Sequence, residues 1–202
     1  MTIPIYAWHW LRDDRTLAEG PHARTYKVEP GVVYWVPDNK PLELCDYGLH
    51  ASECPLDALQ YAPGGTISRV RLWGHVERGR DKLCAYERET LWLADATTAL
   101  HEFACWCTER ALKRERKAGR EPDERSWNAI RVKRAWLRGE ATDEDLAAAR
   151  AAALAAARDA ARDAAWDAAW AAARRGAAWD AERKVQSRKL TRMLEALPRE
   201  EA

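Results

Sequence analysis

The sequence predicts an α+β protein, with a small mixed α/β domain at residues 1–95 followed by an all-α, Ala/Trp-rich helical bundle or hairpin at residues 96–202. Seven of the nine prolines lie in the first part. Its apolar segments are short, rich in β-branched and aromatic residues, and bounded by Gly, Pro or Asp, as strands are. In the second part apolar residues recur at helical spacing instead, and alanine is abundant.

The first half alternates strands with one short helix. Proline in the first turn of residues 55–62 and the Pro63-Gly64-Gly65 stop predict that helix. Within 66–72 the apolar residues Ile67, Val70 and Leu72 do not share strict parity, which predicts a bulge near residues 68–69 or a strand with two covered sides. The strands are expected at 3–11, 32–36, 48–52, 67–76 and 83–93.

The second half carries start and stop signals for four helices. Ser, Thr and Asp favour helix N-caps, acidic residues favour the first turn, and Gly favours the position after the last turn. The helices are expected from Thr97 or Thr98 to Gly119, from Asp123 to Gly139, from the capping-box-like segment 142–145 toward Gly176, and over 177–196 as a fourth helix or a bent continuation.

The third of these helices contains a four-residue repeat, RDAA-RDAA-WDAA-WAAA, over residues 158–173. A period of four places its first members on one slowly rotating stripe, which includes Trp166 and Trp170. Alanine between them allows another helix to approach closely. The two tryptophans are therefore expected either to fill the core of a helical hairpin or to line a groove for a ligand or partner.

Composition excludes several classes of protein. The chain has 33 Lys and Arg against 32 Asp and Glu, a net charge of +1, which argues against a wholesale polyanion binder. With 47% hydrophobic residues it is too apolar for a disordered chain. No apolar run approaches about 18 residues and no leader-like start is present, so we expect neither a membrane span nor secretion. Five irregularly spaced cysteines fit reduced thiols in the cytoplasm, which for a phage-encoded protein is the host cytoplasm.

Charge is nevertheless uneven along the chain. Residues 110–138 hold eleven Lys and Arg against four acids. This local excess could dock phosphates, an acidic protein face or nucleic acid, although no established nucleic-acid motif accompanies it. Arg131, Lys133 and Arg134 are the candidate binding residues of this segment, whose alternative interpretation is a solvated helical surface.

A second candidate site is the string YGLHAS at residues 47–52, which leads directly into the short helix. A strand that ends in small polar residues before a helix places His50 and Ser52 beside backbone N–H groups that can receive an anion. The alternative is structural, with His50 a satisfied histidine and Ser52 a helix N-cap.

These residues resemble the signature of an uncharacterised family found in phage and bacterial genomes. The family pairs a Gly-aromatic/Leu-His-Ala-Cys/Ser string with a following Pro-Leu-Asp, as in GLHAS-x-x-PLDAL-x-Y here. The resemblance covers roughly residues 1–93 and brings no known activity. Its continuation is matched at Val70, Gly74, Val76, Asp81 and Lys82.

The same half also resembles ADP-ribosyltransferases in the order and rough spacing of a few positions. In that family an early His or Arg, a strand–helix unit and a late Glu form a pocket for NAD. The resemblance implies that His9 would position the ribose, Tyr61 would stack on nicotinamide, and Glu89 would stabilise the developing positive charge. His9 lies in WHW without the usual Gly-Ser/Thr after it.

The helical half resembles bacterial immunity proteins of toxin systems, through its Ala/Trp-rich tail and the run RSWNAIRVKRAWLRGEATDEDLAAARAAALAAA. This resemblance implies binding and blocking. His101 and Cys105 are a usable i, i+4 pair, but zinc needs further ligands at fixed spacing, so we predict no metal.

The preferred function is therefore a phage or bacterial accessory binding protein, with inhibition of a host defence component as one form. It would act on a protein partner without catalysis and without a cofactor, and nucleic acid could bind through residues 110–138. One alternative is an NAD-dependent ADP-ribosyltransferase-like enzyme. A second is a structural module that oligomerises through its Ala-rich helix; the oligomeric state is open.

Overall fold

The structure, a computed structural model, describes residues 3–17, 26–163 and 175–202. The chain divides into two compact units: Met1–Thr97 together with Ser187–Ala202, called here the sheet unit, and Thr98–Gln186, the helical unit. Strands and helices are both major components, so the predicted α+β class is confirmed. Across the described helices, none combines the length and apolar character that crossing a membrane requires.

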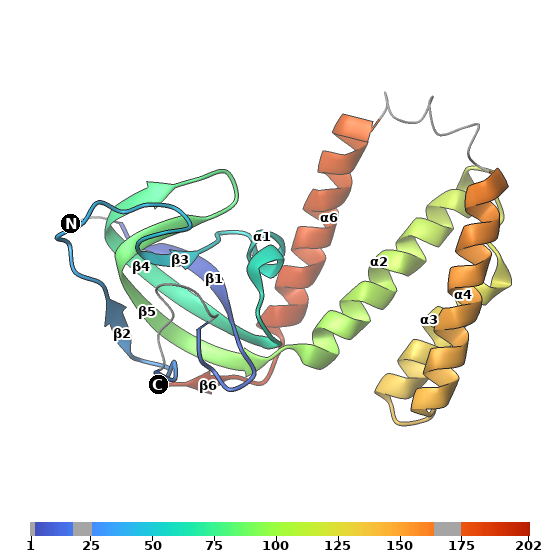
Figure 1. Cartoon of the computed structure of the whole chain (residues 1–202), viewed down its shortest axis with the longest axis horizontal. Coiled ribbons are helices and arrows are strands. Elements are labelled where there is room, and N and C mark those ends of the chain that lie inside the picture. Colours follow the sequence, from blue (N-terminus) through green and yellow to red (C-terminus); the bar gives the residue numbers. More distant parts are fainter. Residues whose placement is uncertain (1–2, 18–25, 164–174) are drawn as a thin grey trace. The chain divides into compact units, whose positions relative to one another are not determined.

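The sheet unit is built around a long hairpin of β4 and β5 (Figure 1). β1 pairs with the free edge of β4, and β2, β3 and β6 pair with successive parts of β5, all antiparallel. Among the described residues the strands are β1 (Ile5–Leu11), β2 (Val33–Trp35), β3 (Leu49–Ala51), β4 (Thr66–Arg78), β5 (Leu83–Asp95) and β6 (Glu200–Glu201).

The sheet curls until β1 meets the residue that follows β3. Trp8 N donates to Ser52 O at 2.8 Å and Ser52 N donates to Trp8 O at 2.9 Å. Strands β1, β4, β5 and β3 therefore form a closed circuit, with an inner and an outer face. Because side chains alternate along a strand, neighbours in sequence lie on opposite faces.

The inner face carries two apolar clusters. Alternate residues of β1, β4 and β5 meet there, and burial of these small and branched side chains stabilises the curl by the hydrophobic effect. One cluster comprises Ala7, Ala51, Val70, Leu72, Leu83 and Ala85, and the other Leu11, Val28 and Leu93.

Of the two explanations that the sequence offers for residues 66–72, the strand with two covered sides is the one observed. The β4–β5 register shifts between Arg69 and Val70, where the extra residue belongs to β5, and between Trp73 and Val76, where it belongs to β4; over residues 66–72, β4 keeps a continuous register with β1. Ile67 and Val70 stand on opposite faces, yet both are completely buried. The first part of β4 is therefore covered on both sides, which explains its two-sided apolar pattern.

The end of the chain belongs to the sheet unit, whereas the sequence division assigned residues 187–202 to the helical half. In α6 (Arg175–Glu195), Leu190 and Leu194 are completely buried. Beyond it, β6 pairs with the end of β5, and Glu200 accepts two hydrogen bonds from Arg15, at 3.0 and 2.6 Å. The C-terminal half is thus not wholly helical, because the edge of β5 offers hydrogen-bond partners to the returning chain.

Helices α2 (Thr97–Lys117), α3 (Glu124–Leu137) and α4 (Asp143–Asp163) lie largely where the sequence predicts them. Asp123 caps α3 by accepting from Arg125 N at 2.8 Å, and Thr142 and Asp145 bond each other reciprocally at the start of α4. Helices α3 and α4 lie side by side (Figure 1). The repeat at 158–173, with Trp166 and Trp170, falls outside the residues whose side chains the structure describes.

Candidate functional site

His9 lies on the inner face of β1, in a polar group between the two apolar clusters. Its strand partner is Ser68, whose hydroxyl donates to His9 O at 2.9 Å. Burial, reinforced by the positive charge of Arg88, holds the pKa of His9 well below its ordinary value. The imidazole is therefore neutral near pH 7. Arg88, itself buried, donates to the backbone carbonyl of His50 at 2.5 Å.

Glu89 lies on the outer face of β5, where it forms an ion pair with Arg71 of β4. Arg71 and Ser68 are three residues apart along β4, so their side chains point to opposite sides of the sheet. The third predicted catalytic residue, Tyr61, ends the 3-10 helix η1 (Leu59–Tyr61) and donates to Asp81 Oδ2 at 2.7 Å. The structure does not bring His9, Tyr61 and Glu89 together.

His50 and Ser52 hold the backbone in place. Cys45 N donates to His50 Nε2 at 3.0 Å, and burial lowers the pKa of His50, with nearby Arg88 and Lys82 acting in the same direction. Ser52 is buried in the bridge to β1. The N-cap of helix α1 (Pro55–Ala58) is Cys54, not Ser52, and this helix is too short to present an anion site.

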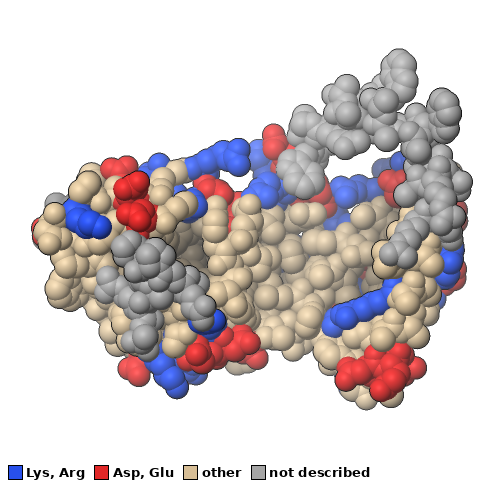
Figure 2. Space-filling model, viewed as in Figure 1, with Lys and Arg blue, Asp and Glu red and all other residues tan. Residues whose placement is uncertain are grey.

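The basic segment 110–138 is largely neutralised by acids, several of which lie outside that segment. Arg110 bonds Glu182 through two nitrogens, at 3.1 and 3.0 Å. Arg131 pairs with Glu124 at 2.6 Å, and the Lys133 ammonium lies 3.7 Å from the centre of the Trp136 ring. On the face shown in Figure 2, Lys and Arg side chains are interspersed with Asp and Glu.

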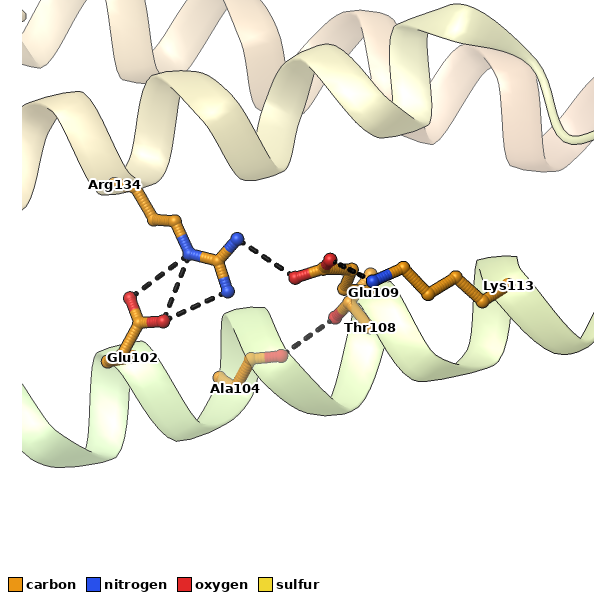
Figure 3. A network of polar contacts seen from close by, with 6 residues as sticks. All are labelled: Glu102, Ala104, Thr108, Glu109, Lys113 and Arg134. Atoms are coloured by element: carbon orange, nitrogen blue, oxygen red, sulfur yellow. Dashed lines mark hydrogen bonds and ion pairs between the residues drawn. The ribbon is translucent and has the colours of Figure 1, made fainter. Parts of the chain in front are cut away.

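Arg134 joins two helices of the helical unit. From α3 its guanidinium reaches Glu102 and Glu109 on α2, with a nitrogen–oxygen distance of 2.9 Å to each (Figure 3). Lys113 in turn donates to Glu109 at 2.5 Å, and these two hydrogen bonds lower the pKa of Glu109. Arg131, Lys133 and Arg134 therefore have partners within the chain, and they do not form the unpaired basic surface that the charge count predicts.

A cleft of about 490 Å³ lies in the sheet unit, between the turn that follows β1 and the end of β5. Its polar groups are bonded to the protein itself: Asp13 accepts from Gly65 N at 2.7 Å, Asp95 accepts from Thr97 N at 2.8 Å, and Glu200 pairs with Arg15. Among the described residues, no group of three or more His, Cys, Asp or Glu side chains could hold a metal ion.

The sequence did not reveal a group of exposed aromatic side chains in the sheet unit. Two rows of side chains run across the strands on the outer face, so that each row takes one residue from each strand that it crosses. One row contains Tyr6, Arg71, Glu89 and Val33, and the next contains Trp73, Glu87 and Trp35. We call Tyr6, Val33, Trp35, Arg71 and Trp73 the aromatic patch.

The patch is exposed where the rest of the outer face is covered. Trp35 is 63% exposed, Tyr6 48% and Val33 46%. Trp8 and Trp92, on the same face, are buried and pack edge to face with ring centroids 5.7 Å apart. The alternation of residues in 5–11 and 33–35 predicts which side chains share a face of the sheet. It does not predict which part of that face stays exposed to solvent.

No family model, curated protein or solved structure matches this chain.

Proposed function

We propose that this chain is an accessory binding protein that acts without catalysis, by contact between its aromatic patch and a protein partner. The observation that carries the proposal is the exposure of Tyr6, Val33 and Trp35 on one face of the sheet, where Val33 and Trp35 are neighbours on β2 and the Arg71–Glu89 pair lies between Val33 and Tyr6. Trp, Tyr and Arg are the side chains that dominate interface energies, and the patch groups three exposed or half-exposed aromatic rings with one arginine on a single face.

The charges around the patch favour a protein over a nucleic acid. Arg71 is paired with Glu89, and exposed Glu87 stands between Trp73 and Trp35. Arg69 also lies 6.0 Å from the centre of the Tyr6 ring, so two guanidiniums face two carboxylates, without the excess of unpaired cations on which binding of a phosphate backbone depends. β2 is also the edge of the described sheet path, where a partner's strand can be added.

The resemblance of residues 1–93 to phage and bacterial proteins supports a phage or bacterial setting, and inhibition of a host defence component is the form of binding that we propose. We also propose that the helical unit is an Ala/Trp-rich bundle or hairpin. The packing of α3 on α4 and the bridge from Arg134 to α2 support this arrangement.

The test compares wild-type protein with a Tyr6→Ala/Trp35→Ala variant. Both are immobilised and exposed to nuclease-treated bacterial lysate, and the retained proteins are quantified by mass spectrometry. Because a hot-spot side chain contributes about 2 kcal/mol, roughly thirtyfold in affinity, we expect a protein that is retained by the wild type to be lost from the variant. That protein is then purified and titrated against both forms.

The matched control is Tyr61→Ala, which removes another exposed aromatic of the sheet unit, 49% exposed, outside the patch. It should retain the partner fully. Equal retention by the patch variant would show that the patch is not the contact surface. Retention from untreated lysate that is absent from the nuclease-treated lysate would indicate nucleic acid. A sedimentation mass that rises with concentration only in the wild type would indicate self-association.

A further inference from the structure

A cysteine and a lysine are in direct contact at the tip of the β4–β5 hairpin. Lys82 Nζ lies 2.7 Å from Cys45 Sγ. The ammonium also lies 4.2 Å from the centre of the Tyr61 ring, whose hydroxyl bonds Asp81. Two segments far apart in sequence thus place a nucleophilic sulfur against a primary amine.

The backbone holds Cys45 in this position. The turn that carries it is closed by Glu43 and Tyr47, with Glu43 N donating to Tyr47 O at 2.9 Å. Cys45 has a left-handed φ of 71°, an uncommon conformation for a residue with a Cβ, and its N–H is fixed by the His50 ring. The opposing Lys82 closes the hairpin tip, where its carbonyl accepts from Gly79 N at 2.8 Å.

Cys45 differs from the other four cysteines. It is exposed, whereas Cys84 and Cys105 are buried and Cys54 contacts the Ser187 hydroxyl at 3.0 Å. Burial raises the pKa of Cys84 to about 11 and also raises the pKa of Cys107, so these thiols stay protonated. Peroxides react with thiolates, which a neighbouring ammonium stabilises. The hydrogen bond to Cys45 correspondingly raises the pKa of Lys82.

We propose that Cys45 and Lys82 form an oxidation site, at which hydrogen peroxide converts the pair into a covalent sulfur–nitrogen cross-link. In the first step the Cys45 thiolate attacks the peroxide. An S–O bond forms, the O–O bond breaks, sulfur loses two electrons, and hydroxide leaves, giving a sulfenic acid. The neutral sulfur no longer holds the proton on Lys82, which passes to water.

In the second step the freed amine attacks the same sulfur. The S–N bond forms as the S–O bond breaks, and the oxygen leaves as water. In sum, one thiol, one ammonium and one hydrogen peroxide give the cross-link, two water molecules and one proton. The link would tie the turn at residues 43–47 to the hairpin tip, and a thiol reductant would reverse it.

The test treats the full chain with hydrogen peroxide and digests it with trypsin without reductant. We expect trypsin to stop cleaving after Lys82, and the peptide 81–88 to appear joined to the peptide that contains Cys45. The joined mass should be lower by two hydrogens than the sum of the separate peptides, and dithiothreitol should restore them.

Three variants separate the contributions. Lys82→Met should abolish the cross-link and slow the loss of the Cys45 thiol. Lys82→Arg keeps a cation but no attacking amine, so its Cys45 should yield a sulfenic acid that dimedone traps, without a link. Cys54→Ser should cross-link as the wild type does. Separate peptides after treatment of the wild type, or a disulfide from Cys45 to Cys84, would overturn the proposal.

Discussion

His9 and Glu89 lie on opposite faces of one sheet. His9 points to the inner face beside Ser68, and Glu89 points to the outer face beside Arg71. A single NAD molecule cannot meet both side chains while the strands between them remain paired. The spacing that makes the chain resemble a transferase thus places these two groups where they cannot share a substrate.

This separation predicts how the chain responds to NAD. Calorimetric titration with NAD, followed by an assay for nicotinamide, should give the same result for wild type and Glu89→Gln, because Glu89 is engaged by Arg71. An NAD-binding heat and a nicotinamide release that both disappear in Glu89→Gln would instead restore the transferase hypothesis. Arg71→Gln is the control that removes the partner of Glu89 and retains the carboxylate.

The partly buried His9, whose Nδ1 is buried, predicts a loss of stability in acid. Burial holds the pKa of His9 well below its ordinary value of 6.5, so below that pH the unfolded chain binds a proton that the folded chain does not. Stability is therefore full above pH 6.5 and decreases as the pH falls, by up to about 1.4 kcal/mol per pH unit for this group.

Urea unfolding followed from about pH 8 to about pH 5 measures this slope. His9→Gln should reduce it, and His50, whose pKa is also lowered, accounts for part of the remainder. Equal slopes for His9→Gln and wild type would contradict the burial of a neutral imidazole.

The bridge at Arg134 predicts a local contribution to the helical unit. Arg134→Ala should lower the free energy of unfolding by about 1 kcal/mol, because it removes charge-assisted bonds to Glu102 and Glu109 that solvent only partly screens. Arg131→Ala, which breaks the exposed pair with Glu124, should change it by less than about 0.5 kcal/mol. Circular dichroism during urea unfolding compares the two variants, and equal losses would argue against the bridge.

The end of α6 predicts a core contribution from a residue far along the chain. Leu190→Ala should destabilise the sheet unit by about 2–5 kcal/mol, because Leu190 is completely buried there. Tryptophan fluorescence reports this unfolding, since Trp8 and Trp92 are buried in the same unit. Arg188→Ala, at an exposed position of the same helix, should behave as wild type. A similar loss in both would mean that the helix contributes through its backbone alone.

Much of the secondary structure follows from local chemistry. Strand alternation, the proline and glycine around α1, and the reciprocal bonds of Thr142 and Asp145 are all encoded within a few residues of where they act. β6 could not be found in this way, because Glu200 and Glu201 have low strand propensity and pair only where β5 offers a free edge.

The candidate site was harder to predict because it depends on distant partners. Counting charges over residues 110–138 omitted Glu102, Glu109 and Glu182, which neutralise arginines of that segment from outside it. The aromatic patch depends on which outer-face residues stay uncovered once the chain has closed. Neither property is present in any short stretch of sequence.

The return of the chain at Ser187 gives the molecule an unusual connectivity. β5 and β6 pair antiparallel, so residues 96–199 are, in topological terms, the loop of a single hairpin. The entropic cost of closing a loop grows slowly with its length. An insert of this size therefore destabilises the β5–β6 pairing little more than a shorter one would. Helical turns could accordingly be added or removed between Thr97 and Ser187 without a change in the strand order of the sheet. We therefore expect related chains to differ in length mainly in that interval.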